Sequence, residues 1–132
     1  MIRLNPEQQV FLTERHLATL TTLRPDGTPH VVPVAATWDA DRGLALVTTE
    51  DGSVKVRNVE AAAGSARAAL CQVDGGRWIT LEGSAAVSRD PAVLADAERR
   101  HARRHHRLAP DPRRVVLVVT VDRVMASTYM AS

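Results

Sequence analysis

Short β-like runs that alternate with tight-turn signals constrain the fold of this chain more than any other feature. Six runs have the Leu, Val and Thr content typical of strands, and Arg24-Pro25-Asp26-Gly27 and Asp74-Gly75-Gly76 are strong hairpin signals between them. The predicted strands cover residues 17–23, 29–38, 44–49, 67–73, 77–87 and 114–125. Consecutive hairpins argue against a parallel doubly wound sheet, whose strands need long crossover connections. The sequence therefore predicts a mainly β fold, a small six-stranded antiparallel barrel with short helices at its ends.

Capping signals predict three short helices between these strands. An N-cap residue followed by proline or by a Gln three positions later marks a helix start, and glycine or proline marks its end. The predicted starts are Asn5-Pro6, Ser53 and Asp90-Pro91, and the predicted ends lie near Arg15-His16, Gly64-Ser65 and Pro110.

Three features of the predicted strands are irregular. Pro33 cannot donate a ladder hydrogen bond, so the strand at 29–38 is expected to be an edge strand or to bulge there. Gly83, in the middle of a long strand, indicates a bulge or a close backbone approach. The nearly continuous valine run at 114–125 is expected to be buried on both faces or at a subunit contact.

The composition limits the classes of protein to which the chain can belong. Its 132 residues predict one domain over residues 1–132, and the 45% hydrophobic but only 3% aromatic content implies a core of Val, Leu and Ala. Because such residues bury less area each, a homodimer is expected. The formal charge of +2 gives no support to nucleic-acid binding. A single cysteine, Cys71, fits a cytoplasmic location, and no apolar run approaches the roughly 20 residues that span a bilayer, so no membrane association is expected.

The segment from Ser53 to Asn58 is the strongest candidate for a ligand site. A helix start offers unpaired N–H groups and a partial positive charge, which favour a bound phosphate or carboxylate. Lys55 is the only lysine in the chain, and Asn58 lies three residues later, on the same face of the predicted helix. A solvated helix surface with one lysine remains the simpler interpretation of the spacing.

Other chemistries find less support. His101, His105 and His106 include an i, i+4 pair, but five arginines surround them and no carboxylate or cysteine completes a metal site, so no metal is predicted. The same basic run lacks aromatic residues for base stacking. No nucleophile-elbow pattern surrounds Ser84. Arg77-Trp78, at the start of a long strand, is a pair suited to a planar anionic ligand, although Trp78 equally suits a core position.

Several segments together resemble one known family. They are residues 11–23, 28–34, 53–58, 76–83 and 112–116, which cover much of the chain. The chain is similar to the flavin/deazaflavin oxidoreductase superfamily, the FMN-binding split β-barrel group that includes pyridoxamine 5′-phosphate oxidase. Within it, the chain most resembles the F420-dependent biliverdin reductases of actinobacteria.

This resemblance implies a homodimer with the cofactor sites at the subunit interface. It implies that Ser53, Lys55 and Asn58 hold the cofactor phosphate. The other cofactor-binding residues that it implies are Thr48 and Thr49 beside the ring and phosphate, His30, Val32 and Pro33 along the tricyclic ring, and Arg77 and Trp78 from the partner chain.

The activity that the resemblance implies is hydride transfer from reduced F420 to a conjugated tetrapyrrole, biliverdin to bilirubin. Arg57 or Arg77 would supply positive charge to the substrate. FMN is the alternative cofactor. The alternative functions are an FMN- or F420-dependent reductase of another planar substrate, such as a quinone, nitro or enone compound, and a non-catalytic flavin or haem carrier. The chain ends at Ser132 without the oxidase branch's C-terminal segment, so pyridoxamine phosphate oxidation is not expected.

Overall fold

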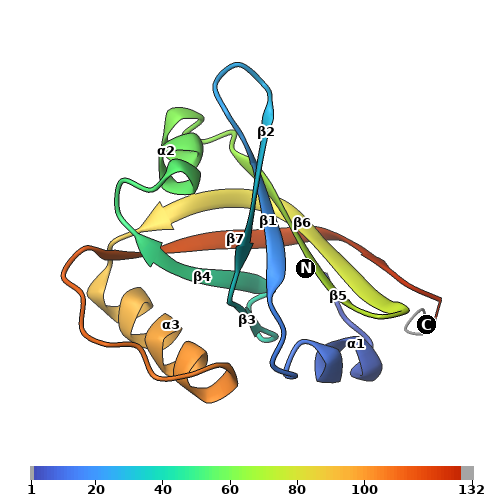
Figure 1. Ribbon diagram of the computed structural model, residues 1–132. Coiled ribbons are helices and arrows are strands. Elements are labelled where there is room, and N and C mark those ends of the chain that lie inside the picture. The colour runs from blue at the N-terminus through green and yellow to red at the C-terminus, as the bar shows by residue number, and fades with distance from the viewer. Residues whose placement is uncertain (1, 129–132) are drawn as a thin grey trace.

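The computed structural model describes residues 2–128, in which one antiparallel sheet curls into a half-open barrel (Figure 1). The strands are β1 (Ala18–Leu23), β2 (Pro29–Val34), β3 (Ala36–Asp39), β4 (Leu44–Glu50), β5 (Arg67–Asp74), β6 (Arg77–Ser88) and β7 (Arg114–Ala126). The helices are α1 (Pro6–Phe11), α2 (Val54–Ala61) and α3 (Pro91–Arg104). The strand order is β2-β1-β5-β6-β7-β4-β3. The mainly β, antiparallel prediction is therefore confirmed.

The predicted number of strands is wrong, because the described residues form seven strands rather than six. The predicted strand 29–38 divides at Ala35 into β2, which pairs with β1, and β3, which pairs with β4. These two strands lie at opposite edges of the sheet, and one straight strand cannot pair along both edges. Pro33 lies within β2, where the register with β1 is unbroken. Its prediction as an edge residue is confirmed, since an edge strand has no second neighbour to lose a hydrogen bond.

The helix caps follow the sequence closely at two of the three helices. At α1, the Gln8 N–H donates to Asn5 Oδ1 over 2.8 Å and the Asn5 N–H donates to Gln8 Oε1 over 3.0 Å, which completes the predicted capping box. At α3, Asp90 Oδ1 accepts from the Ala92 N–H. Helix α1 ends at Phe11, earlier than predicted.

The two longest strands, β6 and β7, pair with each other in the middle of the sheet. The pairing of β6 with β7 shifts register between Glu82 and Gly83, and a Cβ at Gly83 would collide with the Thr120 carbonyl, as the glycine signal predicted. Strand β7 is buried on both faces over residues 115–117, whereas Thr120, Asp122 and Arg123 farther along it are exposed. Its Leu117 and Val119 belong to the barrel core, whereas Val116 packs under α3.

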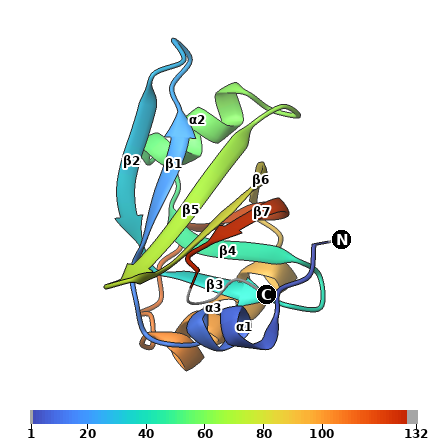
Figure 2. The ribbon, with the colours of Figure 1, turned by 90° about the vertical axis from the view of Figure 1, so that its right-hand side faces the viewer.

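The helices divide between the two ends of the barrel. Helix α2 lies at one end, and α1 and α3 lie at the other (Figures 1 and 2). Strand β4 leads directly into α2 through Asp51-Gly52-Ser53, so the end of β4 and the start of α2 form one corner. None of the described helices is long and apolar enough to cross a membrane.

Candidate functional site

The corner between β4 and α2 contains a buried hydroxyl without a hydrogen bond. Ser53 has the extended backbone of an N-cap, as predicted, but its side chain makes no capping bond. Its Oγ is buried and has no partner within residues 2–128. An unpaired buried polar atom is costly, so this hydroxyl marks a place where an external group can be bound.

Lys55 lies in the first turn of the same helix and is half-buried. Burial lowers the pKa of its ammonium group, and desolvation is the one cause of that shift, with no carboxylate acting on it from the described part of the chain. A partly desolvated cation without a counter-charge is stabilised by a bound anion. The predicted anion site is thus compatible with the electrostatics of this corner.

Asn58 does not project beside Lys55 but packs inward. It is 6% exposed, and its Nδ2 donates to the Thr22 hydroxyl on β1 over 3.0 Å. This buried bond fixes α2 against the sheet. The side-chain amide therefore anchors the helix start, a contact that spacing along the sequence could not reveal because Thr22 lies 36 positions away.

Thr22 connects this anchor to the predicted ring-binding strand. In the β1–β2 register, Thr22 lies opposite His30 and Leu20 lies opposite Val32. Residues at alternate positions share a face, so the side chains of His30 and Val32 lie on the inner face with Thr22. The Nδ1 of His30 is buried and lacks a hydrogen-bond partner among the residues described. Pro33 is exposed on the opposite face.

The structure thus brings several of the predicted residues together at the α2 end. Thr48 and Thr49, both half-buried, end β4 opposite Val116 and Val115 of β7. A small hollow of about 90 Å³ lies nearby between α2 and the sheet, and Thr22, Asn58 and Arg67 are among its lining residues. Arg57 is exposed on α2.

Two arginines that the sequence reasoning missed hold the β4–α2 corner in place. Arg89 donates to Asp51 Oδ1 over 2.8 Å and to Glu60 Oε2 over 3.0 Å, so it joins the two ends of α2. Arg113 donates to the Asp51 carbonyl over 3.1 Å, and the Asp51 N–H donates back to the Arg113 carbonyl over 2.8 Å. These contacts link loops far apart in the sequence, and no local motif marks them.

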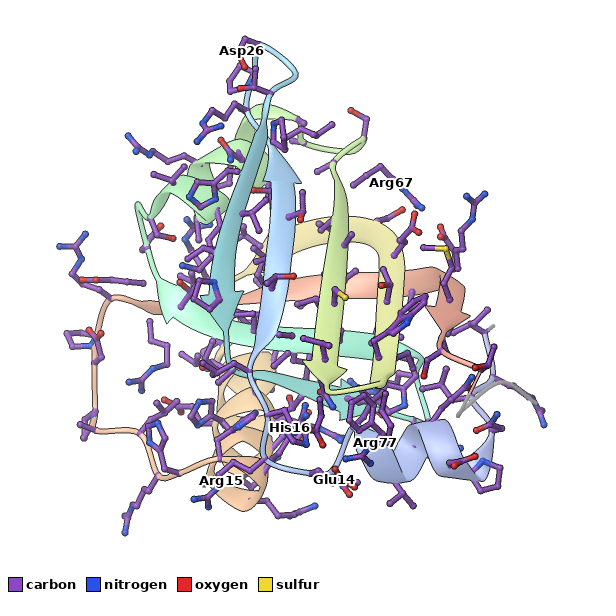
Figure 3. The ribbon with its side chains drawn as sticks, turned by 45° about the vertical axis from the view of Figure 1, so that its right-hand side comes forward. Glu14, Arg15, His16, Asp26, Arg67 and Arg77 are labelled. Atoms are coloured by element: carbon purple, nitrogen blue, oxygen red, sulfur yellow. The ribbon has the colours of Figure 1, made fainter. Side chains whose placement is uncertain are left out.

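Arg77 and Trp78 lie at the other end of the sheet within this chain. Figure 3 shows Arg77 beside Glu14 and His16, whereas Arg67, at the α2 end, lies far from them. Arg77 donates to both oxygens of Glu14 over 2.9 and 3.1 Å, and to Asp74. Its guanidinium, assisted by His16, lowers the pKa of Glu14 to about 2. One chain alone does not bring this pair to Lys55.

The same cluster contains the kinds of ligand atoms that bind metals. Ligand atoms of Glu14, His16 and Asp74 all lie within 4.8 Å of one another. Arg77, however, donates to both carboxylates, and its guanidinium carbon also lies 4.6 Å from the centre of the Phe11 ring. The resident cation of this cluster is therefore an arginine, which stabilises the packing of α1 against the sheet.

This chain is similar in sequence to one family and to a named bacterial protein. The family described as pyridoxamine 5′-phosphate oxidase matches residues 4–127. A protein from Mycobacterium tuberculosis named F420H(2)-dependent biliverdin reductase is 49% identical over 125 residues, which cover 95% of this chain and 89% of that protein.

Solved structures give the same fold. A structure titled F420 Reductase superposes with a TM-score of 0.70 at 24% identity, covering 89% of this chain and 94% of the other. A conserved hypothetical protein from Mycobacterium tuberculosis superposes with a TM-score of 0.78 at 20% identity, covering 96% and 86%. At these identities the structures establish the split-barrel fold alone.

Proposed function

The chain belongs to the pyridoxamine 5′-phosphate oxidase family, and we propose that it is a reductase that transfers a hydride from reduced F420 to biliverdin, giving bilirubin. The observation that carries this proposal is the 49% identity, over nearly the whole chain, to a protein named for that activity. F420 is the cofactor, and FMN is the alternative that the fold also permits.

The donors at the β4–α2 corner fit an anionic cofactor. Lys55 is a half-buried cation without a carboxylate partner, and the Ser53 hydroxyl is buried and unpaired within residues 2–128. In the proposed complex, Lys55 and Ser53 bind the cofactor phosphate, which satisfies both groups. Asn58 keeps α2 against β1, so that the N–H groups of the helix start face the phosphate.

The strand β2 supplies the surface for the cofactor ring in this proposal. The His30 and Val32 side chains face inward from β2, and Pro33 completes the strand segment that lies along the ring. Thr48 and Thr49 contact the ring and phosphate from the end of β4. When bound, reduced F420 supplies the hydride, and these residues orient the ring against the substrate and exclude water.

We propose that the active form is a homodimer with a cofactor site at each subunit contact. Arg77 and Trp78 begin β6, whereas Lys55 lies on α2 at the opposite end of the barrel, so they can contribute to its site only from a second copy. Arg57 is exposed on α2 and bears no carboxylate partner in the part of the chain described, which makes it the stronger candidate to pair with a substrate propionate.

An anaerobic assay with reduced F420 and biliverdin tests this function. The expected result is loss of biliverdin absorbance with matching formation of oxidised F420 and bilirubin. FMN with a chemical reductant, in place of reduced F420, serves as the cofactor control. Oxidation of reduced F420 by quinone or nitro compounds, but not by biliverdin, would overturn the proposed substrate. Failure of F420 to bind would overturn the proposed cofactor as well.

A further inference from the structure

Two clefts meet at Trp38, at the end of the molecule opposite α2. One, of about 410 Å³, lies between the N-terminal segment and β3, and Ile2 and Leu4 line it. The other, of about 200 Å³, lies between the end of α1, β3 and α3. Figures 1 and 2 show α1 and α3 at the same end of the barrel, below β3. Trp38 borders both clefts, and none of the proposed cofactor residues lines either of them. The two clefts are together called the depression around Trp38.

The depression carries an excess of positive charge. Four arginines and one carboxylate line it, namely Arg3, Arg100, Arg103, Arg104 and Asp41. Arg100 is neutralised, since it pairs with Asp96 over 2.9 Å and with Asp39 over 3.3 Å. The other arginines lining the clefts are not balanced in this way.

Arg104 and Arg103 differ in their hydrogen-bond partners, and neither forms an ion pair with the described residues. Arg104 donates only to uncharged acceptors, the carbonyls of Glu14 and Ala36 and the side chain of Gln72, so its charge is not cancelled by those bonds. Arg103 is exposed and makes no hydrogen bond or ion pair with the described residues. The dipole of α3 is by itself a sufficient reason for basic residues near its C-terminus. It does not explain why these residues line a cleft beside an aromatic ring.

Trp38 supplies that aromatic wall. Its ring is partly buried against the barrel core, and its Nε1–H is buried without an acceptor in the part of the chain described. An indole beside guanidinium groups suits a ligand that combines a planar apolar body with a negative charge, because the ring gives a stacking surface and arginine gives directed hydrogen bonds to a carboxylate.

We propose that the depression around Trp38 is a second ligand site, which binds a small organic anion with a planar apolar body. The planar body lies against Trp38 and the carboxylate lies toward Arg103, both in the smaller cleft, which these two residues line. The site is independent of Lys55 and of the proposed reaction.

Titration with 2-naphthoate, followed by two-dimensional ¹H–¹⁵N NMR, tests this proposal. The chain has two tryptophans, so two indole N–H signals are expected, and Trp38→Phe assigns them. The expected result is a saturable shift of the Trp38 indole signal and no shift of the Trp78 signal. The uncharged 2-naphthamide, which has nearly the same shape, should bind at least about tenfold more weakly because it lacks the charge that arginine recognises.

Arg103→Gln and Lys55→Ala test which of the two cations binds the ligand. Arg103→Gln removes an exposed charge with no structural partner among residues 2–128, and it should weaken 2-naphthoate binding by about fivefold. Lys55→Ala should leave that binding unchanged. The proposal is overturned if the Trp38 signal does not move at millimolar ligand, if naphthamide binds as well as naphthoate, or if Lys55→Ala and not Arg103→Gln abolishes the shift.

Discussion

Lys55, at the start of α2, and Arg104, at the end of α3, are both half-buried cations, yet their surroundings differ in one decisive respect. Burial lowers the pKa of both groups, that of Arg104 to about 10. Arg104 donates from all three of its nitrogens, to Glu14, Ala36 and Gln72, whereas Lys55 has no hydrogen-bond or ion-pair partner within residues 2–128. A half-buried cation that donates from each of its nitrogens to groups of its own chain serves the fold. One left without a partner is suited to a ligand.

The largest effect on stability is expected at Arg104. Arg104→Ala removes hydrogen bonds that join α3 to β3, to β5 and to the segment after α1, and it leaves buried acceptors unpaired. Urea unfolding should show a loss of about 2–4 kcal/mol in the free energy of unfolding. The affinity for F420 should fall far less than it does in Lys55→Ala, since none of these contacts involves Lys55 or Ser53. A loss of F420 affinity at unchanged stability would reverse the roles assigned to Arg104 and Lys55.

Asn58→Ala should affect both properties, because Asn58 belongs to the fold and positions the helix start. Loss of the buried bond to Thr22 is expected to cost about 1–2 kcal/mol of unfolding free energy and to weaken F420 binding. A double-mutant cycle with Thr22→Val isolates this bond, and its coupling energy should be about 0.5–1.5 kcal/mol. A coupling energy near zero would show that Asn58 acts through another contact.

The α3 end should also be the acid-sensitive part of the molecule. Burial lowers the pKa of His101 and His105 below the ordinary value of 6.5, and Arg104, Arg15 and Arg114 add positive charge around them. The unfolded chain therefore binds more protons than the folded chain below pH 6.5. Stability should fall as the pH drops from 6.5 through the lowered values and should not depend on these groups above it. Thermal unfolding from pH 7.5 to 5, with His105→Asn as the variant that flattens the profile, measures this effect.

The smallest effect on stability and binding is expected at Arg89, whose exposed side chain bonds to Asp51 and Glu60 at the two ends of α2. Its pairs with Asp51 and Glu60 are exposed, so Arg89→Ala should change unfolding free energy by less than about 1 kcal/mol. F420 binding should nevertheless weaken a few-fold, because Asp51 immediately precedes Gly52 and Ser53. Arg99→Ala, which breaks an exposed pair with Asp96 on α3, is the matched control and should leave binding unchanged. If both variants weakened F420 binding equally, Arg89 would have no specific role at the β4–α2 corner.

The sequence predicted local features far better than distant contacts. The capping box at Asn5, the bulge at Gly83 and the edge position of Pro33 all follow from backbone chemistry within a few residues, and the structure confirms them. The division of the strand at Ala35 was missed because it depends on the sheet curling so that one segment meets both edges.

The same distinction applies to the candidate site. Lys55 could be proposed as a site residue from the sequence because a lone lysine at a helix start is a local signal, and its role stays a prediction. The anchoring of Asn58 by Thr22 and the bracing by Arg89 were not predictable, since their partners are brought near only by the fold. The contribution of Arg77 and Trp78 stays a prediction that depends on a second copy of the chain.

The most direct test of this account is a titration of F420 into the wild-type protein and into Lys55→Ala, with urea unfolding of both. Loss of the Lys55 hydrogen bond to a charged group should cost about 1.5–3 kcal/mol of binding free energy, or roughly ten- to a hundredfold in Kd. The free energy of unfolding of the variant without cofactor should be unchanged or slightly higher, because a partly desolvated charge without a counter-ion has been removed. An unchanged Kd, or a variant whose main defect is stability, would contradict the claim that Lys55 is held for a ligand.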